Sequence, residues 1–110
     1  MNTTHFNALE AYIEQDSKAV LFFSQQELSP SQIEEYSTNA AVLNAVKKII
    51  AERDAIRIMC GARVTAYWAT IVKYVMDIDT EQYPHSLPMN ERRFRATLKN
   101  YQEFGYAGLI

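Results

Sequence analysis

The sequence predicts an all-α fold, a small bundle of four to five helices. Apolar residues recur at spacings of three and four along most of the chain, which is typical of helices with one buried face. The 110 residues include only three Gly and three Pro, fewer than a turn-rich all-β fold needs. With 48% hydrophobic and 22% charged residues, the composition is that of a globular protein, and the length predicts one helical domain over residues 1–110.

The first 28 residues predict two short helices. Thr3 or Thr4 can cap the first, whose spacing of apolar residues indicates a helix and not a strand. Its apolar face would consist of Phe6, Leu9, Tyr12 and Ile13. The apolar run at residues 19–23 fits a buried helical turn or a strand, and the continuation at residues 25–28 favours a helix because Gln, Glu and Leu suit one.

A third helix is predicted to begin near Pro30, which suits the first position of a helix. Ser31 and Glu34 have the spacing of a capping box, in which hydroxyl and carboxylate satisfy free backbone amides. Residues 37–39 interrupt or restart this helix. From residue 40 the pattern is regular, and the helix should reach at least Asp54 and as far as Met59.

Gly61 predicts a break or a close packing contact, because glycine inside a helix costs about 1 kcal/mol relative to alanine. Residues 63–77 then predict a helix, although their many β-branched and aromatic residues leave a strand open. The proposed core stripe is Val64, Tyr67, Trp68, Ile71 and Val75. Residues 77–88 contain two prolines and few core residues and predict a connecting loop.

The last helix is predicted from about Glu91 to Phe104, as the main part of a basic segment at residues 90–104 that Asn90 can cap. Gly105 can supply the left-handed residue that ends it, and Tyr106 can then pack back on the helix. At about 100° per residue, one face is apolar and the opposite face is basic. The apolar face is Phe94, Leu98 and Tyr101, and the basic face is Arg92, Arg95 and Lys99, flanked by Arg93.

Charge is distributed unevenly along the chain. The net charge is −2, but residues 1–40 carry −5, residues 41–82 carry +1 and residues 83–110 carry +2. An acidic front and a basic rear can orient a protein on a polyanion. The basic excess is nevertheless small compared with that of most nucleic-acid-binding domains.

The sequence offers no set of residues for catalysis, so we expect neither an enzyme nor a cofactor. His5 and His85 are far apart and have no partners at metal-ligand spacing. Asp77, Asp79 and Glu81 resemble part of a calcium loop, but the required Gly is missing. Cys60 has apolar neighbours, which indicates a buried structural thiol. The aromatic set could stack on bases, but helical spacing favours core packing. This set is Tyr67, Trp68 and Tyr74.

Localisation is predicted to be cytoplasmic. A single cysteine excludes an internal disulfide. The N-terminal residues lack the basic start and apolar run of a signal peptide, and no apolar stretch approaches the roughly 18 residues of a membrane span. No membrane partner is therefore expected.

Residues 87–110 resemble the helix-turn-helix segment of transposase and integrase-like proteins of mobile elements, in which a Pro precedes a basic helix followed by an acidic residue, Gly and Leu-Ile. The matching residues are Leu87, Pro88, Arg92, Arg93, Leu98, Lys99, Tyr101, Glu103, Gly105, Tyr106, Leu109 and Ile110. The resemblance implies a helix-turn-helix-like C-terminal part that binds DNA. In those proteins a separate domain is catalytic, so this chain would be an N-terminal fragment or a short relative. The long connection at residues 77–88 departs from the turn of about three or four residues in a compact helix-turn-helix.

Two functional hypotheses follow. The first is a non-catalytic module that binds double-stranded DNA through Arg92, Arg93, Arg95 and Lys99. The alternative is a small helical protein-interaction or oligomerising accessory protein of phage or plasmid origin, in which the acidic residues 1–40 contact a basic partner or a second copy of the chain. A contiguous exposed patch at Phe22, Phe23 or Trp68 would favour the alternative, and burial of these side chains would favour DNA.

Overall fold

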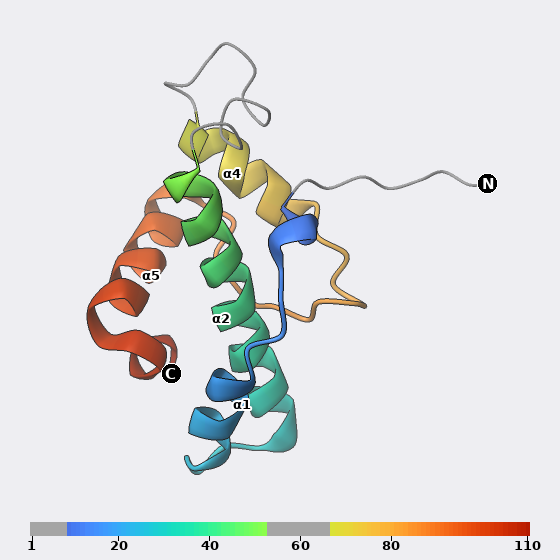
Figure 1. Ribbon diagram of the computed structural model, residues 1–110, viewed down its shortest axis with the longest axis vertical. Helices are drawn as coiled ribbons and strands as arrows, with labels where there is room; N and C mark the ends of the chain where they lie inside the picture. The colour runs from blue at the N-terminus through green and yellow to red at the C-terminus, as the bar shows by residue number, and fades with distance from the viewer. Residues whose placement is uncertain (1–8, 53–66) are drawn as a thin grey trace, which may run out of the picture.

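The computed structural model describes residues 9–52 and 67–110, and these residues form helices and connections without any strand (Figure 1). The all-α class is therefore confirmed. The elements are the 3₁₀ helix η1 (Glu10–Tyr12), the α-helices α1 (Ser17–Ser24), α2 (Pro30–Ala51), α4 (Tyr67–Met76) and α5 (Glu91–Phe104), and the 3₁₀ helix η3 (Gly105–Leu109). None of the described helices combines the length and the apolarity that crossing a membrane requires.

Helix α2 is the longest element and the centre of the fold. Helix α1 packs beside its N-terminal half, and α5 lies next to α2 and runs in the opposite direction (Figure 1). After α5 the chain turns back, so η3 contacts both α1 and α2. Helix α4 contacts α5 and lies near the C-terminal end of α2 (Figure 1).

One hydrophobic core joins all these elements. The largest side chains that are fully buried come from the segment before α1, from α1, from α2, from α4 and from α5. They are Leu9, Phe23, Val42, Leu43, Val46, Ile49, Ile71, Val75 and Phe94. Burying such a side chain stabilises a fold by about 1.5–3 kcal/mol, so this shared core holds the helices together.

The start of α2 is a capping box, but with different residues from those predicted. Ser29 Oγ accepts a hydrogen bond from the Gln32 backbone N–H at 3.2 Å, and Gln32 Oε1 accepts one from the Ser29 N–H at 2.9 Å. The assignment to Ser31 and Glu34 is therefore wrong. Because Pro30 occupies the first helical position, as predicted, the capping residue must be the one before it.

Helix α2 is continuous through residues 37–39 and ends earlier than the sequence indicated. The Glu52 N–H donates to the carbonyls of Lys48 and Ile49, and Glu52 itself is extended (φ −106°, ψ 104°). The prediction of a helix to Asp54 or Met59 is therefore wrong. The Glu52 carboxylate accepts a hydrogen bond from the Tyr12 hydroxyl at 3.2 Å, which ties the end of α2 to η1.

The prediction of a first helix is wrong over residues 9–13, the part of that helix that the structure describes. Only Glu10–Tyr12 is helical, as the 3₁₀ helix η1, and Ile13 is already extended (φ −78°, ψ 120°). Extended residues 13–16 then run along α2 to the start of α1 (Figure 1). Residues 19–23 are helical as favoured, but α1 ends at Ser24, so its continuation through residues 25–28 is wrong. Thr3, Thr4, His5 and Phe6 lie outside the described residues.

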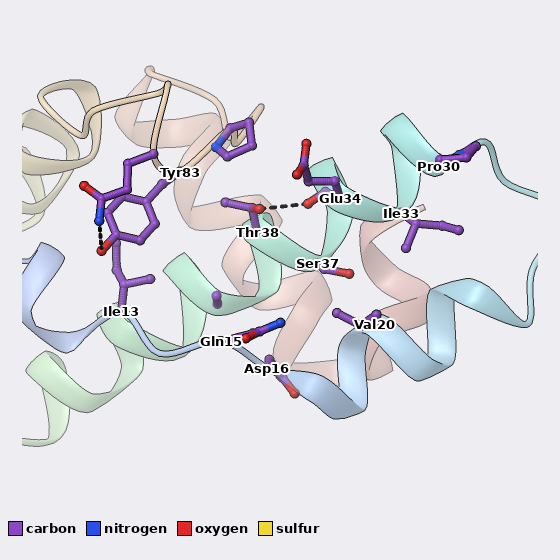
Figure 2. Close-up of a pocket in the computed structure, with 13 residues that line it drawn as sticks. Ile13, Gln15, Asp16, Val20, Pro30, Ile33, Glu34, Ser37, Thr38 and Tyr83 are labelled. Carbon is purple, nitrogen blue, oxygen red and sulfur yellow. Dashed lines mark hydrogen bonds between the residues drawn. The ribbon is translucent and has the colours of Figure 1, made fainter.

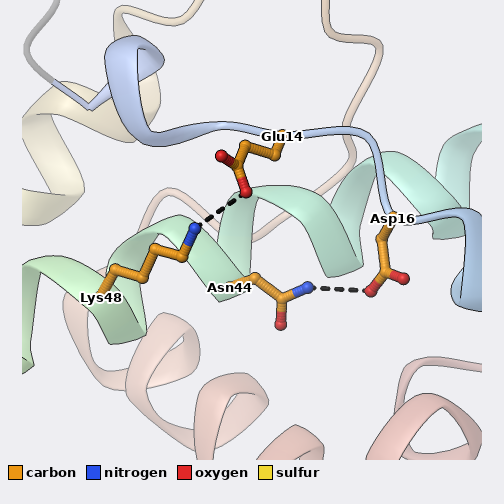
Figure 3. A network of polar contacts seen from close by, with 4 residues as sticks. All are labelled: Glu14, Asp16, Asn44 and Lys48. Carbon is orange, nitrogen blue, oxygen red and sulfur yellow. Dashed lines mark hydrogen bonds and ion pairs between the residues drawn. The ribbon is translucent and has the colours of Figure 1, made fainter.

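A hydrogen-bond network around Asp16 connects α1, α2, α5 and η3. Asp16 caps α1, since its Oδ1 accepts from the Ala19 N–H at 3.1 Å. Its Oδ2 accepts from Asn44 Nδ2 at 2.9 Å (Figure 3) and from the Tyr106 hydroxyl at 2.8 Å. The Asn44 Oδ1 in turn accepts from the Tyr101 hydroxyl at 2.6 Å. The network therefore fixes how the C-terminal elements lie on α1 and α2.

The network shifts the pKa values of its members. Partial burial acts to raise the pKa of Asp16, but hydrogen bonds from Tyr106, Ala19 and Asn44 outweigh it, and the pKa is lowered. Burial and the bond to the Asp16 carboxylate raise the pKa of Tyr106 to about 12. A neighbouring ion pair joins Lys48 Nζ to Glu14 at 2.9 Å (Figure 3), but both side chains are largely exposed, so it contributes little.

The second half of the chain agrees with the sequence where the structure describes it. Residues 67–76 are helical, so the strand is excluded there, and Ile71 and Val75 are buried. Residues 77–90 form the predicted connection to α5. The predictions for Cys60, Gly61 and Val64 fall on residues 53–66, outside the described part.

Candidate nucleic-acid interface

Helix α5 has the predicted boundaries, and local interactions explain them. Asn90 caps it by accepting a hydrogen bond from the Arg93 backbone N–H at 3.1 Å. Gly105 ends it with φ 64° and ψ −146°, a conformation that is essentially restricted to glycine. The Tyr106 ring then packs on Tyr101, with 6.0 Å between ring centroids, so the predicted return onto the helix is confirmed.

The two faces of α5 separate into core and solvent. Phe94, Leu98 and Tyr101 are 0%, 3% and 7% exposed, and all belong to the core of the fold. All four cations that the sequence indicated for DNA contact are exposed on the same helix. They are Arg92, Arg93, Arg95 and Lys99. Because the apolar face anchors α5 to the bundle, the basic face is held on a rigid element.

The four cations differ in how far they are engaged within the protein. The Arg95 guanidinium lies 5.0 Å from the ring centroid of Trp68 on α4, and its Nη1 lies 4.0 Å from Glu91 Oε1. In the described ranges, Arg92, Arg93 and Lys99 form no ion pair. These three side chains can therefore meet an external anion without first breaking an internal salt bridge.

Two features of the surface around α5 were not identified from the sequence. Glu103, at about 100° per residue, falls on the same side of α5 as Arg92 and Lys99, so the basic face is confined to the first turns of the helix. A hollow of about 400 Å³ also lies between α4 and α5, lined by Trp68, Arg95 and Lys99 among others. The first feature follows from the helical angles, but the second depends on the docking of α4.

The acidic residues and histidines that the sequence offers as possible metal ligands take part in local interactions where the structure describes them. Among the described residues, no group of three or more His, Cys, Asp or Glu could hold a metal ion. Asp79 organises its own loop by accepting from the Glu81 N–H at 3.0 Å. His85 Nδ1 accepts from the Leu87 N–H at 3.1 Å, and burial lowers the pKa of His85. His85 thus acts within the connection, and His5 lies outside the described residues.

The aromatic side chains named as discriminators do not form an exposed patch. Phe23 is fully buried, and Phe22 and Trp68 are half-buried. The Phe22 ring packs against Phe23 and Tyr106, with centroid distances of 5.3 and 5.6 Å. Only Phe23 is thus buried as the DNA hypothesis expects, and the partial burial of Phe22 and Trp68 does not separate the two hypotheses.

The connection between α4 and α5 is residues 77–90, far longer than the turn of about three or four residues in a compact helix-turn-helix. Comparisons with protein-family models, curated proteins and solved structures find no match. The resemblance of residues 87–110 to mobile-element proteins, and the helix-turn-helix-like assignment, therefore stay predictions.

Proposed function

We propose that this chain is a non-catalytic helical module that binds double-stranded DNA, as the resemblance to transposase and integrase-like mobile-element proteins implies. One observation supports the proposal above others: α5 buries its apolar residues and exposes Arg92, Arg93, Arg95 and Lys99 on a docked helix. A rigid helix with cations on its outer face suits contact with a phosphate backbone or entry into a major groove.

The side chains have distinct roles in this proposal. Arg92 and Lys99 contact phosphates, and Arg93 flanks them. Arg95 contributes once its weak 4.0 Å ion pair with Glu91 exchanges for a phosphate. About three phosphate contacts predict that log K falls against log salt concentration with a slope of about −3.

The acidic front of the chain sets the orientation on DNA. Residues 1–40 carry a net charge of −5, so a polyanion repels that part while α5 attracts it. Binding is therefore expected to be weak at physiological salt and strong only when α5 faces the duplex.

Fluorescence anisotropy with a labelled 20-base-pair duplex at 50 and 150 mM salt tests the proposal. The double variant Arg92→Glu/Lys99→Glu should abolish binding. The matched control is Lys18→Glu/Lys73→Glu, which changes the net charge equally at two exposed lysines that lie on α1 and α4 and not on α5. Absence of wild-type binding at 50 mM salt, or an equal loss in the control, would refute a DNA interface on α5.

A protein-interaction or oligomerising accessory protein is the second candidate. It draws support from a different surface, a mainly apolar groove with two acidic residues between the extended residues 13–16, α1 and α2. The two functions are compatible, because the groove includes no residue of α5.

A further inference from the structure

A groove of about 420 Å³ differs from the surface of α5 in its charge, because acidic and not basic residues are among those that line it. Three segments line it: residues 13–20, the first half of α2 and residues 82–84 (Figure 2). Its volume falls within the range of about 300–1,000 Å³ that is usual for binding sites. Its walls are mainly apolar, with Ile13, Val20, Ile33 and Tyr83 among the lining side chains.

The polar atoms of the groove include one unsatisfied group. Ser37 is only 8% exposed, and its Oγ is buried without a hydrogen-bond partner in the described part of the chain. The next hydroxyl, Thr38 Oγ1, donates to the Glu34 carbonyl at 2.8 Å, the usual solution within a helix (Figure 2). The Ser37 hydroxyl instead points between Ile33 and Val20 (Figure 2). Since an unpaired buried hydroxyl is unfavourable, Ser37 indicates a ligand with a hydrogen-bonding group.

The charge of the groove indicates the sign of that ligand. Asp16 and Glu34 line it, and none of the described lining residues is Lys, Arg or His. Asp16 is already engaged with Asn44 and Tyr106, whereas Glu34 is exposed at the rim. The groove therefore repels phosphates and attracts a cation beside an apolar group.

The shape favours a peptide over a free small molecule. The groove is open to solvent along α2, whereas sites for small molecules usually enclose about 70–90% of the ligand surface. An open apolar groove with a charged rim suits a side chain presented on a backbone, which supplies amide groups for hydrogen bonds.

We propose that this groove docks a segment of a partner protein in which an apolar side chain stands next to a Lys or Arg. The apolar side chain fills the space between Ile33 and Val20, a backbone amide of the segment pairs with the Ser37 hydroxyl, and the cation meets Glu34. The site is independent of the DNA proposal, because none of these residues belongs to α5.

Selection of a phage-displayed library of random 12-residue peptides on the full chain provides the probe. The expected winners carry Leu, Ile, Met or Phe within about three positions of a Lys or Arg. No enrichment, or enrichment of acidic peptides, would overturn the proposal. A second copy of the chain would be the occupant under two conditions: the enriched sequences resemble the chain's own residues 87–93, and the chain self-associates in sedimentation unless it carries Glu34→Lys. That result would overturn the proposal of a separate partner protein.

The best synthetic peptide is then measured by fluorescence anisotropy against three variants. Glu34→Lys should weaken binding about tenfold, because attraction is replaced by repulsion at an exposed site, and Ser37→Ala about threefold. The matched control Glu27→Lys reverses an exposed acid that does not line the groove and should stay within twofold of wild type. Equal affinities across all variants would place the peptide elsewhere and refute the groove. Glu34→Lys should leave the DNA affinity of α5 undiminished, which separates this test from the previous one.

Discussion

Loss of the hydrogen bond from Tyr106 to Asp16 should destabilise the fold by a measurable amount. Tyr106→Phe removes a 2.8 Å O–H···O⁻ bond but keeps the ring, which packs against Phe22, Phe23 and Tyr101. Hydrogen bonds to charged groups contribute about 1.5–3 kcal/mol. Because Asp16 and Tyr106 are both only partly buried, solvent screening reduces this, and we expect a loss of about 1–1.5 kcal/mol in the free energy of unfolding.

The pH dependence of this loss follows from the lowered pKa of Asp16. A carboxyl group whose pKa is lower in the folded state stabilises the fold above its unfolded pKa, near 3.8, and the contribution disappears as the pH falls through the folded pKa. The difference between wild type and Tyr106→Phe should therefore be full at pH 6 and shrink well below pH 4.

Urea unfolding followed by circular dichroism at 222 nm, at pH 6 and near pH 3, measures both quantities. Tyr83→Phe is the matched control, since Tyr83 is half-buried outside the network and, within the described residues, its hydroxyl accepts one long hydrogen bond, from Gln82 at 3.3 Å. It should change stability by less than about 0.5 kcal/mol. A Tyr106→Phe variant as stable as the control, or a loss that is the same at both pH values, would refute a structural role for the Asp16 network.

Ser29→Ala should cost about 1 kcal/mol in thermal or urea unfolding and Ser31→Ala almost nothing, because Ser29 is the helix cap; equal costs would contradict the capping box. Gly105→Ala should cost about 1–2 kcal/mol, although a Cβ there has nothing within 4 Å, because φ is +64°; an unchanged melting temperature would show that the backbone relaxes. His85→Asn should flatten the loss of stability that the wild type shows below about pH 6.5. Burial lowers the pKa of His85 in the folded state, so the unfolded chain binds more protons there and the folded state is destabilised as the pH falls. Urea midpoints at pH 7.5 and 5.5 that change as in the wild type would exclude His85 as the source.

Local signals predicted α5 well because they agree with one another. Asn90, the apolar face and Gly105 mark its start, its packing and its end within one continuous stretch. The end of α2 could not be predicted in the same way, since no glycine or proline lies near Ala51 and the next one along the chain is Gly61. There the end coincides with a tertiary contact, the bond from Tyr12 to Glu52, and not with a local breaker.

The basic face of α5 and the groove also differ in how far the sequence predicts them. The exposed cations of α5 follow from helical spacing alone, so the sequence predicts their face correctly. The groove combines three separate segments, one of which lies more than 40 positions further along the chain, and the unpaired hydroxyl of Ser37 becomes visible only when they are assembled. The acidic character of residues 1–40 was the one signal in the sequence that could have pointed to it.

The bond between Asp16 and Tyr106 also constrains the order of folding, because it joins residues 90 positions apart. During synthesis, α1 and α2 can form early, but the Asp16 carboxylate lacks its tyrosine partner until Tyr106 has left the ribosome. Contacts of such long sequence separation form late and slow folding. We therefore expect the nascent chain to hold α1 and α2 in a loose, protease-sensitive arrangement, which tightens only when η3 closes over them.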